Sequence, residues 1–265
     1  MILKAIILGI VEGITEFLPI SSTGHLIIFG HLLDFTGPFA VMFEIIIQLG
    51  AILAVVIFYW KKIFESLKNL KPGQWGFKLW FWMFIAFVPS GILAFLFNDI
   101  IEEKFFSPLT VSIALIIGAI MMIIVENASR GKRIDDFLKT GAKKSFLIGC
   151  AQCMALIPGM SRSASTIMGG LLVGLSLKAA AEFSFFLAIP TMFAATGYSL
   201  LKGFGAMSGI EMAALATGFI VSFIVAFIVV RKFLSFLGSH KLRGFAYYRL
   251  AVGIIMLALI YAKLI

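Results

Sequence analysis

Charged residues are scarce in this chain. Only 13% of its 265 residues are Asp, Glu, Lys or Arg, whereas 61% are hydrophobic, and the mean hydropathy is +1.08. Several stretches of about 17–25 residues carry almost no charge, which is the length that a helix needs to cross a bilayer. The composition therefore predicts a polytopic helical membrane protein. The apolar runs are continuous rather than alternating, which argues against a membrane β-barrel.

Cysteine is also scarce, since the chain has only Cys150 and Cys153, which form a CxxC pair. A thioredoxin-like motif needs a soluble βαβ setting, and one CxxC pair supplies too few ligands for a zinc site. We interpret both residues as small apolar residues of a helix. No charged segment precedes an Ala-x-Ala site near the start, so we expect the first hydrophobic segment to stay in the mature protein.

The basic residues give a net charge of +9 but gather in particular loops. Segments 61–78, 126–145 and 231–243 are rich in Lys and Arg, whereas 98–106 and 202–208 carry one lysine each. By the positive-inside rule, the three basic segments are cytoplasmic. The charge thus sets the membrane topology, and we expect no nucleic-acid partner.

Segments from the two halves of the chain resemble one another in order and at a nearly constant offset. Gly9 to Glu12 has a counterpart in Gly149 to Gln152. Further matches are Leu18-Pro19 with Ile157-Pro158, Ser21 with Ser161, Gly30 with Gly169, and Glu44 with Glu182. We predict a single membrane domain, 1–265, built from two homologous halves, 1–125 and 146–265, which a basic cytoplasmic linker, 126–145, joins.

Each half begins with a hydrophobic segment that a Pro/Gly/Ser stretch divides into two short pieces. These lie at roughly 2–18 and 22–33, and at roughly 146–157 and 163–176. Because such pieces are too short to be separate spans, we expect two re-entrant helix-loop-helix hairpins that enter from opposite faces. About six full transmembrane helices should follow, at roughly 39–60, 79–97, 107–125, 179–201, 209–230 and 245–263. The predicted fold is an all-α inverted-topology repeat, with both termini outside and the site where the broken helices meet.

Two carboxylates interrupt the first short segment, where residues 9–25 read GIVEGITEFLPISSTGH. A charge at membrane depth costs at least ~2.5–3.5 kcal/mol, so Glu12 and Glu16 are functional candidates. Their i, i+4 spacing places them on one helix face, where they repel unless a proton or a cation lies between them. Oxygen ligands suit Mg²⁺ or Ca²⁺. The alternative is a pair bonded to backbone or hydroxyl groups.

Hydroxyl residues and a histidine follow these carboxylates. Ser21, Ser22 and Thr23 are typical N-capping residues, but a helix N-terminus with free N–H groups also binds anions. His25 lies three residues after Ser22 and is a candidate base, acid or nucleophile. A structural role for the imidazole stays open.

A second polar cluster, PGMSRSAST at 158–166, contains Arg162. The guanidinium fork suits bidentate contacts with phosphate, and Ser161 and Ser163 beside it are candidate phosphate-binding residues. The alternative is a structural Arg162 paired with Glu12 or Glu16. Together the two clusters suggest phosphate chemistry at a membrane.

The motifs EGITEFLPISSTGH (12–25) and PGMSRSAST closely resemble the two signature segments of the undecaprenyl-diphosphate phosphatases, the bacitracin-resistance family. The resemblance extends over essentially the whole chain, including FEIIIQLGAILAV at 43–55 and EFSFFLAIPTM at 182–192. It implies an enzyme of the bacterial cytoplasmic membrane that removes the terminal phosphate of a C55 polyprenyl diphosphate. The product would be the monophosphate carrier for peptidoglycan synthesis. An outward-facing site and a divalent cation are also implied.

On this resemblance the catalytic residues are Glu16, Ser22, His25 and Arg162, and a cation is held by Glu12 and Glu16. Ser22 is the preferred nucleophile, with Glu16 or His25 accepting its proton. Attack by water or by His25 remains an alternative, as does a transporter or flippase that moves an anionic polyprenyl lipid through the same site. The sequence leaves open whether the protein forms a homodimer.

Overall fold

The computed structural model describes residues 1–129, 133–201, 207–238 and 241–264, without the side chains of residues 98, 99, 102, 200 and 201. Over these ranges the chain is all helical, with α-helices and two short 3-10 helices and no β-strand. The predicted all-α class is thus confirmed. Residues 130–132, 202–206 and 239–240 of the predicted basic and connecting segments lie outside the described residues; they include Arg130, Lys132, Lys202 and His240.

Six of the described helices are long and apolar enough to cross a membrane. They are α3 (Pro38–Phe58), α5 (Trp75–Phe105), α6 (Pro108–Ala128), α9 (Leu177–Leu201), α10 (Gly209–Phe236) and α11 (Arg243–Tyr261). The prediction of about six spans is confirmed. The segment 61–78, which the sequence predicts to be a loop, contains a further helix, α4 (Trp60–Lys68). This helix buries Ile63 and Ser66, and the Trp80 indole donates a 2.9 Å hydrogen bond to the Ser66 hydroxyl.

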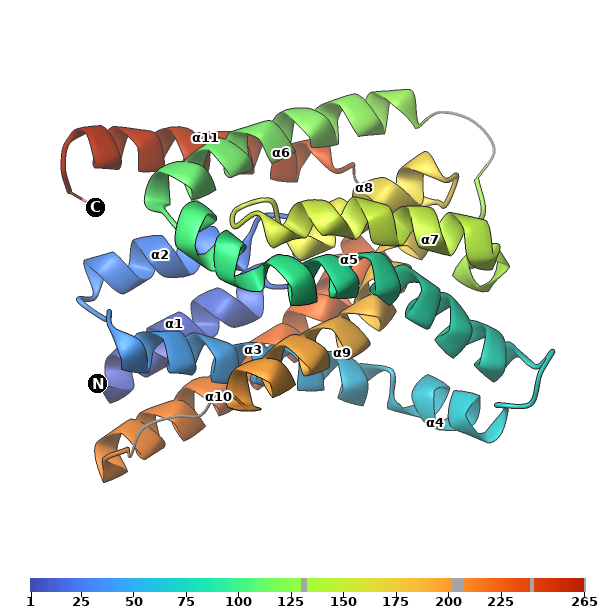
Figure 1. The fold of residues 1–265 in the computed structure, drawn as a ribbon, viewed down its shortest axis with the longest axis horizontal. Coiled ribbons are helices and arrows are strands. Elements are labelled where there is room, and N and C mark those ends of the chain that lie inside the picture. The colour runs from blue at the N-terminus through green and yellow to red at the C-terminus, as the bar shows by residue number, and fades with distance from the viewer. Residues whose placement is uncertain (130–132, 202–206, 239–240, 265) are drawn as a thin grey trace.

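Two pairs of short helices surround breaks in the chain. In the first pair, α1 (Ile2–Thr15) and α2 (Ser22–Leu32) are joined by the turn 16–21. In the second pair, α7 (Gly141–Gln152) runs into the 3-10 helix Cys153–Leu156, and α8 (Arg162–Leu172) follows the turn 157–161. Each pair folds back on itself. The two pairs enter the bundle from opposite ends, α1 and α2 from the left and α7 and α8 from the right (Figure 1).

Both breaks have the same backbone geometry. Ser21 and Ser161, which are matched positions of the two halves, have φ values of 71° and 70°. Each is the N-cap of its helix, and its hydroxyl accepts a hydrogen bond from the amide three residues on. The same correspondence holds where α2 and α8 end, because the Phe35 amide donates to the Gly30 carbonyl and the Leu175 amide donates to the Gly170 carbonyl. This geometry pairs Gly30 with Gly170 rather than with Gly169.

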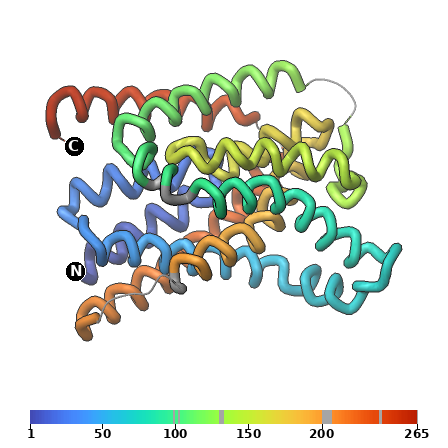
Figure 2. The backbone as a smooth tube through the Cα atoms, in the orientation of Figure 1, coloured from blue at the N-terminus to red at the C-terminus, as the bar shows by residue number. Residues whose placement is uncertain are grey.

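Each hairpin packs closely against a long helix from the other part of the chain. A Cβ on Gly9 of α1 would lie 2.8 Å from the carbonyl oxygen of Gly218 in α10. A Cβ on Gly149 of α7 would lie even closer to the carbonyl oxygen of Ala86 in α5. Real Cβ atoms do not approach backbone this closely, so both crossings require glycine. The tube in Figure 2 shows the resulting interleaved path, with both termini at one end and the connection from α3 to α5 at the other.

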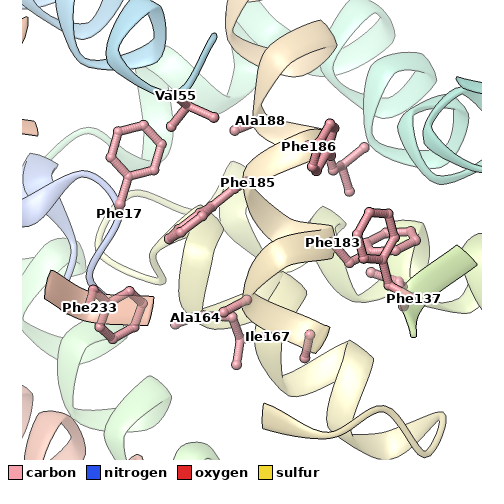
Figure 3. Close-up of a cluster of buried hydrophobic side chains, with 14 of the residues drawn as sticks. Phe17, Val55, Phe137, Ala164, Ile167, Phe183, Phe185, Phe186, Ala188 and Phe233 are labelled. Carbon is pink, nitrogen blue, oxygen red and sulfur yellow. The ribbon is translucent and has the colours of Figure 1, made fainter. Parts of the chain in front are cut away.

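The core near the site is aromatic. Phe17, in the first turn, points toward Phe185 of α9, with ring centroids 5.3 Å apart and the rings nearly perpendicular (Figure 3). On the other side of α9, Phe183 and Phe186 contact Phe137. Edge-to-face pairs of this kind hold defined orientations. Phe17 therefore fixes the first turn against α9, next to Glu16.

Candidate functional site

The turns of the two hairpins meet inside the bundle. The Ser163 hydroxyl, at the start of α8, donates a 2.8 Å hydrogen bond to the carbonyl of Leu18 in the first turn. Arg162 and Glu16 form an ion pair across the same junction, with 3.0 Å between Nη2 and Oε1. Side chains from the two halves of the chain are thus in direct contact.

Glu16 is the centre of this junction. Its Oε1 accepts from the Arg162 guanidinium, and its Oε2 accepts a 2.7 Å hydrogen bond from the Ser22 hydroxyl. The Arg162 and Glu16 side chains are only 12% and 10% exposed, so water screens their attraction weakly. The Ser22 proton already points at a carboxylate that can accept it.

Arg162 is held on several sides. Its Nη1 donates to the carbonyl oxygen and the hydroxyl of Ser184 in α9, at 3.0 and 3.3 Å, and the guanidinium lies over the Phe17 ring at 5.6 Å. An Arg162 paired with Glu12 or Glu16 was given in the sequence analysis as the alternative to a phosphate-binding role, and the pair with Glu16 is present. The buried Nε–H has no partner among the described residues, so one donor remains for an anion.

The hydroxyl residues cap the two short helices at the junction. The Ser21 hydroxyl accepts from the Gly24 amide at 3.4 Å, and the Ser161 hydroxyl accepts from the Ala164 amide at 3.3 Å. The Ser161 and Ser163 hydroxyls are 3.0 Å apart and share a hydrogen bond. Thr23 is half-buried in the first turn of α2. The N-termini of α2 and α8 therefore both lie at the junction, and the N-terminus of a helix is the positive end of its dipole.

His25 is buried, and its two ring nitrogens bond to groups other than the Ser22 hydroxyl and the Glu16 carboxylate. Its Nδ1 lies 2.7 Å from the Ser21 carbonyl oxygen, and its Nε2 lies 2.8 Å from the Tyr248 hydroxyl. The imidazole and phenol rings are parallel, at 2° and 5.6 Å between centroids. The structure therefore places His25 between the N-cap of α2 and helix α11.

Glu12 lies one helical turn before Glu16 and is fully buried. Neither of its carboxylate oxygens has a hydrogen-bond partner among the described residues. A buried polar group in this state is costly, so these oxygens are suited to a proton or a cation. The described part of the chain contains no cluster of three or more His, Cys, Asp or Glu side chains placed to hold a metal. A cation at Glu12 would therefore need oxygens from Glu16, water or the ligand.

Arg249 of α11 was missed by the sequence reasoning. It is fully buried, and its five N–H groups point at five backbone carbonyls. Those oxygens belong to Pro19 in the first turn, Gly159 and Met160 in the second turn, and Ala114 and Leu115 in α6, at 3.0 to 3.4 Å. One guanidinium thus ties both turns to α6. The sequence signal that could have found Arg249 is an arginine inside an apolar span, because a charge at membrane depth is costly and is usually paired or functional.

Two residues of the long spans that contact the site were also not singled out in the sequence analysis. Ser184, which binds Arg162, and Tyr248, which binds His25, lie within α9 and α11. The Thr166 hydroxyl donates to the Ser184 hydroxyl at 2.6 Å and supports it. Their sequence context gave no spacing that linked them to the turns. Cys150, in α7, and Cys153, in the 3-10 helix that follows, are free thiols.

Comparison with known proteins gives relatives over the full length. A chain from Thermoanaerobacter pseudethanolicus named undecaprenyl-diphosphatase is 67% identical, over 100% of this chain and 99% of that protein. Chains with the same name from Caldanaerobacter subterraneus and Clostridium tetani are 63% and 48% identical, each over 100% of this chain and 98% of the relative. The family model of the bacitracin resistance protein BacA matches residues 5–255. With its two broken helices, its six apolar spans and this full-length similarity, the chain belongs to the BacA family of bacitracin resistance proteins.

Proposed function

We propose that this protein hydrolyses undecaprenyl diphosphate to undecaprenyl phosphate and inorganic phosphate. That activity would recycle the lipid carrier for peptidoglycan synthesis and confer resistance to bacitracin. The relatives named undecaprenyl-diphosphatase support the substrate, and the family supports the link to bacitracin. The observation that carries the chemistry is Glu16, bonded at once to the Ser22 hydroxyl and the Arg162 guanidinium.

Ser22 is the nucleophile in this proposal. Its Oγ attacks the terminal phosphorus while the hydroxyl proton passes to Glu16 Oε2, which already accepts it at 2.7 Å. The bond from that phosphorus to the bridging oxygen breaks, and undecaprenyl phosphate leaves with the proton that Glu16 had accepted, so that Glu16 is a carboxylate again. Water then hydrolyses the phosphoserine, with Glu16 as base, and releases inorganic phosphate. Direct attack by water is the rival mechanism, whereas His25 has both ring nitrogens bonded elsewhere.

Positive charge at the junction would hold the diphosphate. Phosphoryl transfer depends mainly on positioning and on electrostatic stabilisation of the phosphate oxygens. Arg162 contributes its charge and its free Nε–H, and the N-terminal ends of α2 and α8 contribute backbone amides near Ser21, Thr23, Ser161 and Ser163. Arg249 adds a second buried guanidinium that binds both turns.

A divalent cation, Mg²⁺ or Ca²⁺, fits the carboxylate pair in part. Glu12 supplies two oxygens without partners among the described residues, whereas both oxygens of Glu16 already have donors. Mg²⁺ is commonly bound by one or two carboxylates together with substrate phosphates. Glu12 would be the main protein ligand and Glu16 a shared one, and the bound ion would offset phosphate charge.

The two hairpins are re-entrant in this proposal and belong to inverted repeats. The matched positive-φ serines, Ser21 and Ser161, together with entry from opposite ends of the bundle, support this arrangement. If the basic connections lie in the cytoplasm, the first hairpin and both termini face the outside of the bacterial cytoplasmic membrane. The junction would then open to the outer surface, where the diphosphate headgroup is released.

The test is phosphate release from undecaprenyl diphosphate by the detergent-purified protein, with Mg²⁺, with Ca²⁺ and with EDTA. Glu16→Ala and Arg162→Ala should abolish cation-dependent release, whereas the exposed-site variant Lys61→Ala should release phosphate like the wild type. If the folded wild type binds the lipid but releases no phosphate, the result would favour a transporter that uses the same broken helices.

A further inference from the structure

His25 is held by two contacts that together define its tautomer. The Ser21 carbonyl oxygen, 2.7 Å from Nδ1, can only accept a hydrogen bond, so Nδ1 carries the proton. In the neutral ring, Nε2 is then an acceptor, and the Tyr248 hydroxyl at 2.8 Å is its donor. The contacts thus select the Nδ1–H tautomer, which is the less common form of a free histidine side chain.

Tyr248 provides the polar contact to Nε2 from the other half of the chain. The tyrosine is 45% exposed, whereas His25 is 5% exposed, so the phenol lies between the buried imidazole and the surroundings. The imidazole and phenol planes are parallel, with an angle of 2° between them. The next residue along α11, Arg249, binds the Pro19 carbonyl two residues before Ser21. Two adjacent residues of α11 therefore hold the backbone around Ser21. Arg249 binds the Pro19 carbonyl directly, and Tyr248 acts on the Ser21 carbonyl through His25.

We propose that Tyr248 is a positioning residue for the phosphatase reaction. Its hydroxyl holds His25 in the Nδ1–H tautomer, and His25 in turn holds the Ser21 carbonyl and the turn that presents Ser22 to Glu16. The chain of contacts runs from α11 through the imidazole to the backbone next to the nucleophile. The expected change in kcat rests on the proposed function, whereas the expected tautomer of His25 does not.

The first readout is independent of activity. The chain has three histidines, His25, His31 and His240, so ¹⁵N-histidine labelling gives few ring signals, and the variants His31→Gln and His240→Gln assign them. In membranes the wild type should show His25 protonated on Nδ1 and hydrogen-bonded at Nε2. Tyr248→Phe keeps the ring and removes only the hydroxyl, so the Nε2 signal should move to that of a nitrogen without a donor. Tyr247→Phe, at the exposed neighbouring position, should leave the signals unchanged.

The second readout is kinetic. Tyr248→Phe should lower kcat by ~10–100-fold, the size expected when a buried group loses its hydrogen-bond partner, with KM changed less than threefold in protein that stays folded. A wild-type His25 that is protonated on Nε2, or a Tyr248→Phe enzyme with wild-type kcat, would overturn the proposal. A wild type that shows the predicted tautomer but releases no phosphate would instead contradict the proposed function alone.

Discussion

Replacing Arg249 by lysine should weaken the fold at the junction of the two turns. Arginine has five N–H donors, and all five are used on backbone carbonyls. Lysine keeps the positive charge but has three donors on one nitrogen, so at least two carbonyls lose a bond to a charged group. Each such bond contributes about 1.5–3 kcal/mol, which predicts a loss of about 3–6 kcal/mol.

This loss is large beside a typical unfolding free energy of about 5–15 kcal/mol, and it can be measured by SDS titration of the purified protein. The wild type, Arg249→Lys and Arg231→Lys would be compared, since Arg231 is exposed in α10 and its replacement should cost less than about 0.5 kcal/mol. Phosphate release by Arg249→Lys should also fall under conditions where it stays folded, because the turns separate. An Arg249→Lys protein as stable as Arg231→Lys would refute the role of the guanidinium as a tie between the turns.

Three further substitutions test separate parts of the site. Arg162→Lys should lower kcat by ~100–1,000-fold, because a point charge cannot bind Glu16 and Ser184 at once; near-normal steady-state rates would contradict this. Glu12→Gln should raise the Mg²⁺ concentration for half-maximal rate by ~10–100-fold, and an unchanged Mg²⁺ titration would favour a protonated, structural Glu12. Gly118→Ala should lower the unfolding temperature, because its Cβ would overlap the Arg249 guanidinium, whereas Gly244→Ala, in open space, should not.

The sequence predicted the parts of the fold that depend on local composition. Long apolar runs predicted the six spans, and the Pro/Gly/Ser stretches predicted the breaks before Ser22 and Arg162. The sequence offered a pair of Arg162 with Glu12 or Glu16 only as the structural alternative to phosphate binding, and the contact with Glu16 is present. Rare intramembrane charges commonly pair with one another. The spans and the breaks could be predicted because the residues that cause each of them lie in one short segment of the sequence.

What could not be predicted depends on which helices cross. Tyr248 meets His25, and Ser184 meets Arg162, only because α11 and α9 pass the turns at particular heights. The helical spacing predicts His25 near Ser22, but tertiary contacts rotate its ring toward Tyr248. Helix α4 was missed because a short amphipathic helix in a lysine-rich segment resembles a charged loop.

The central claim is that the Ser22 hydroxyl, bonded to Glu16, attacks the terminal phosphate. The most direct measurement is the initial rate of phosphate release by Ser22→Ala, beside Ser112→Ala, a buried serine whose hydroxyl bonds to a carbonyl of its own helix. We predict at least a ~1,000-fold loss of kcat for Ser22→Ala and wild-type kcat for Ser112→Ala. A Ser22→Ala protein that retains more than a tenth of the wild-type kcat would contradict the account and transfer the attack to water.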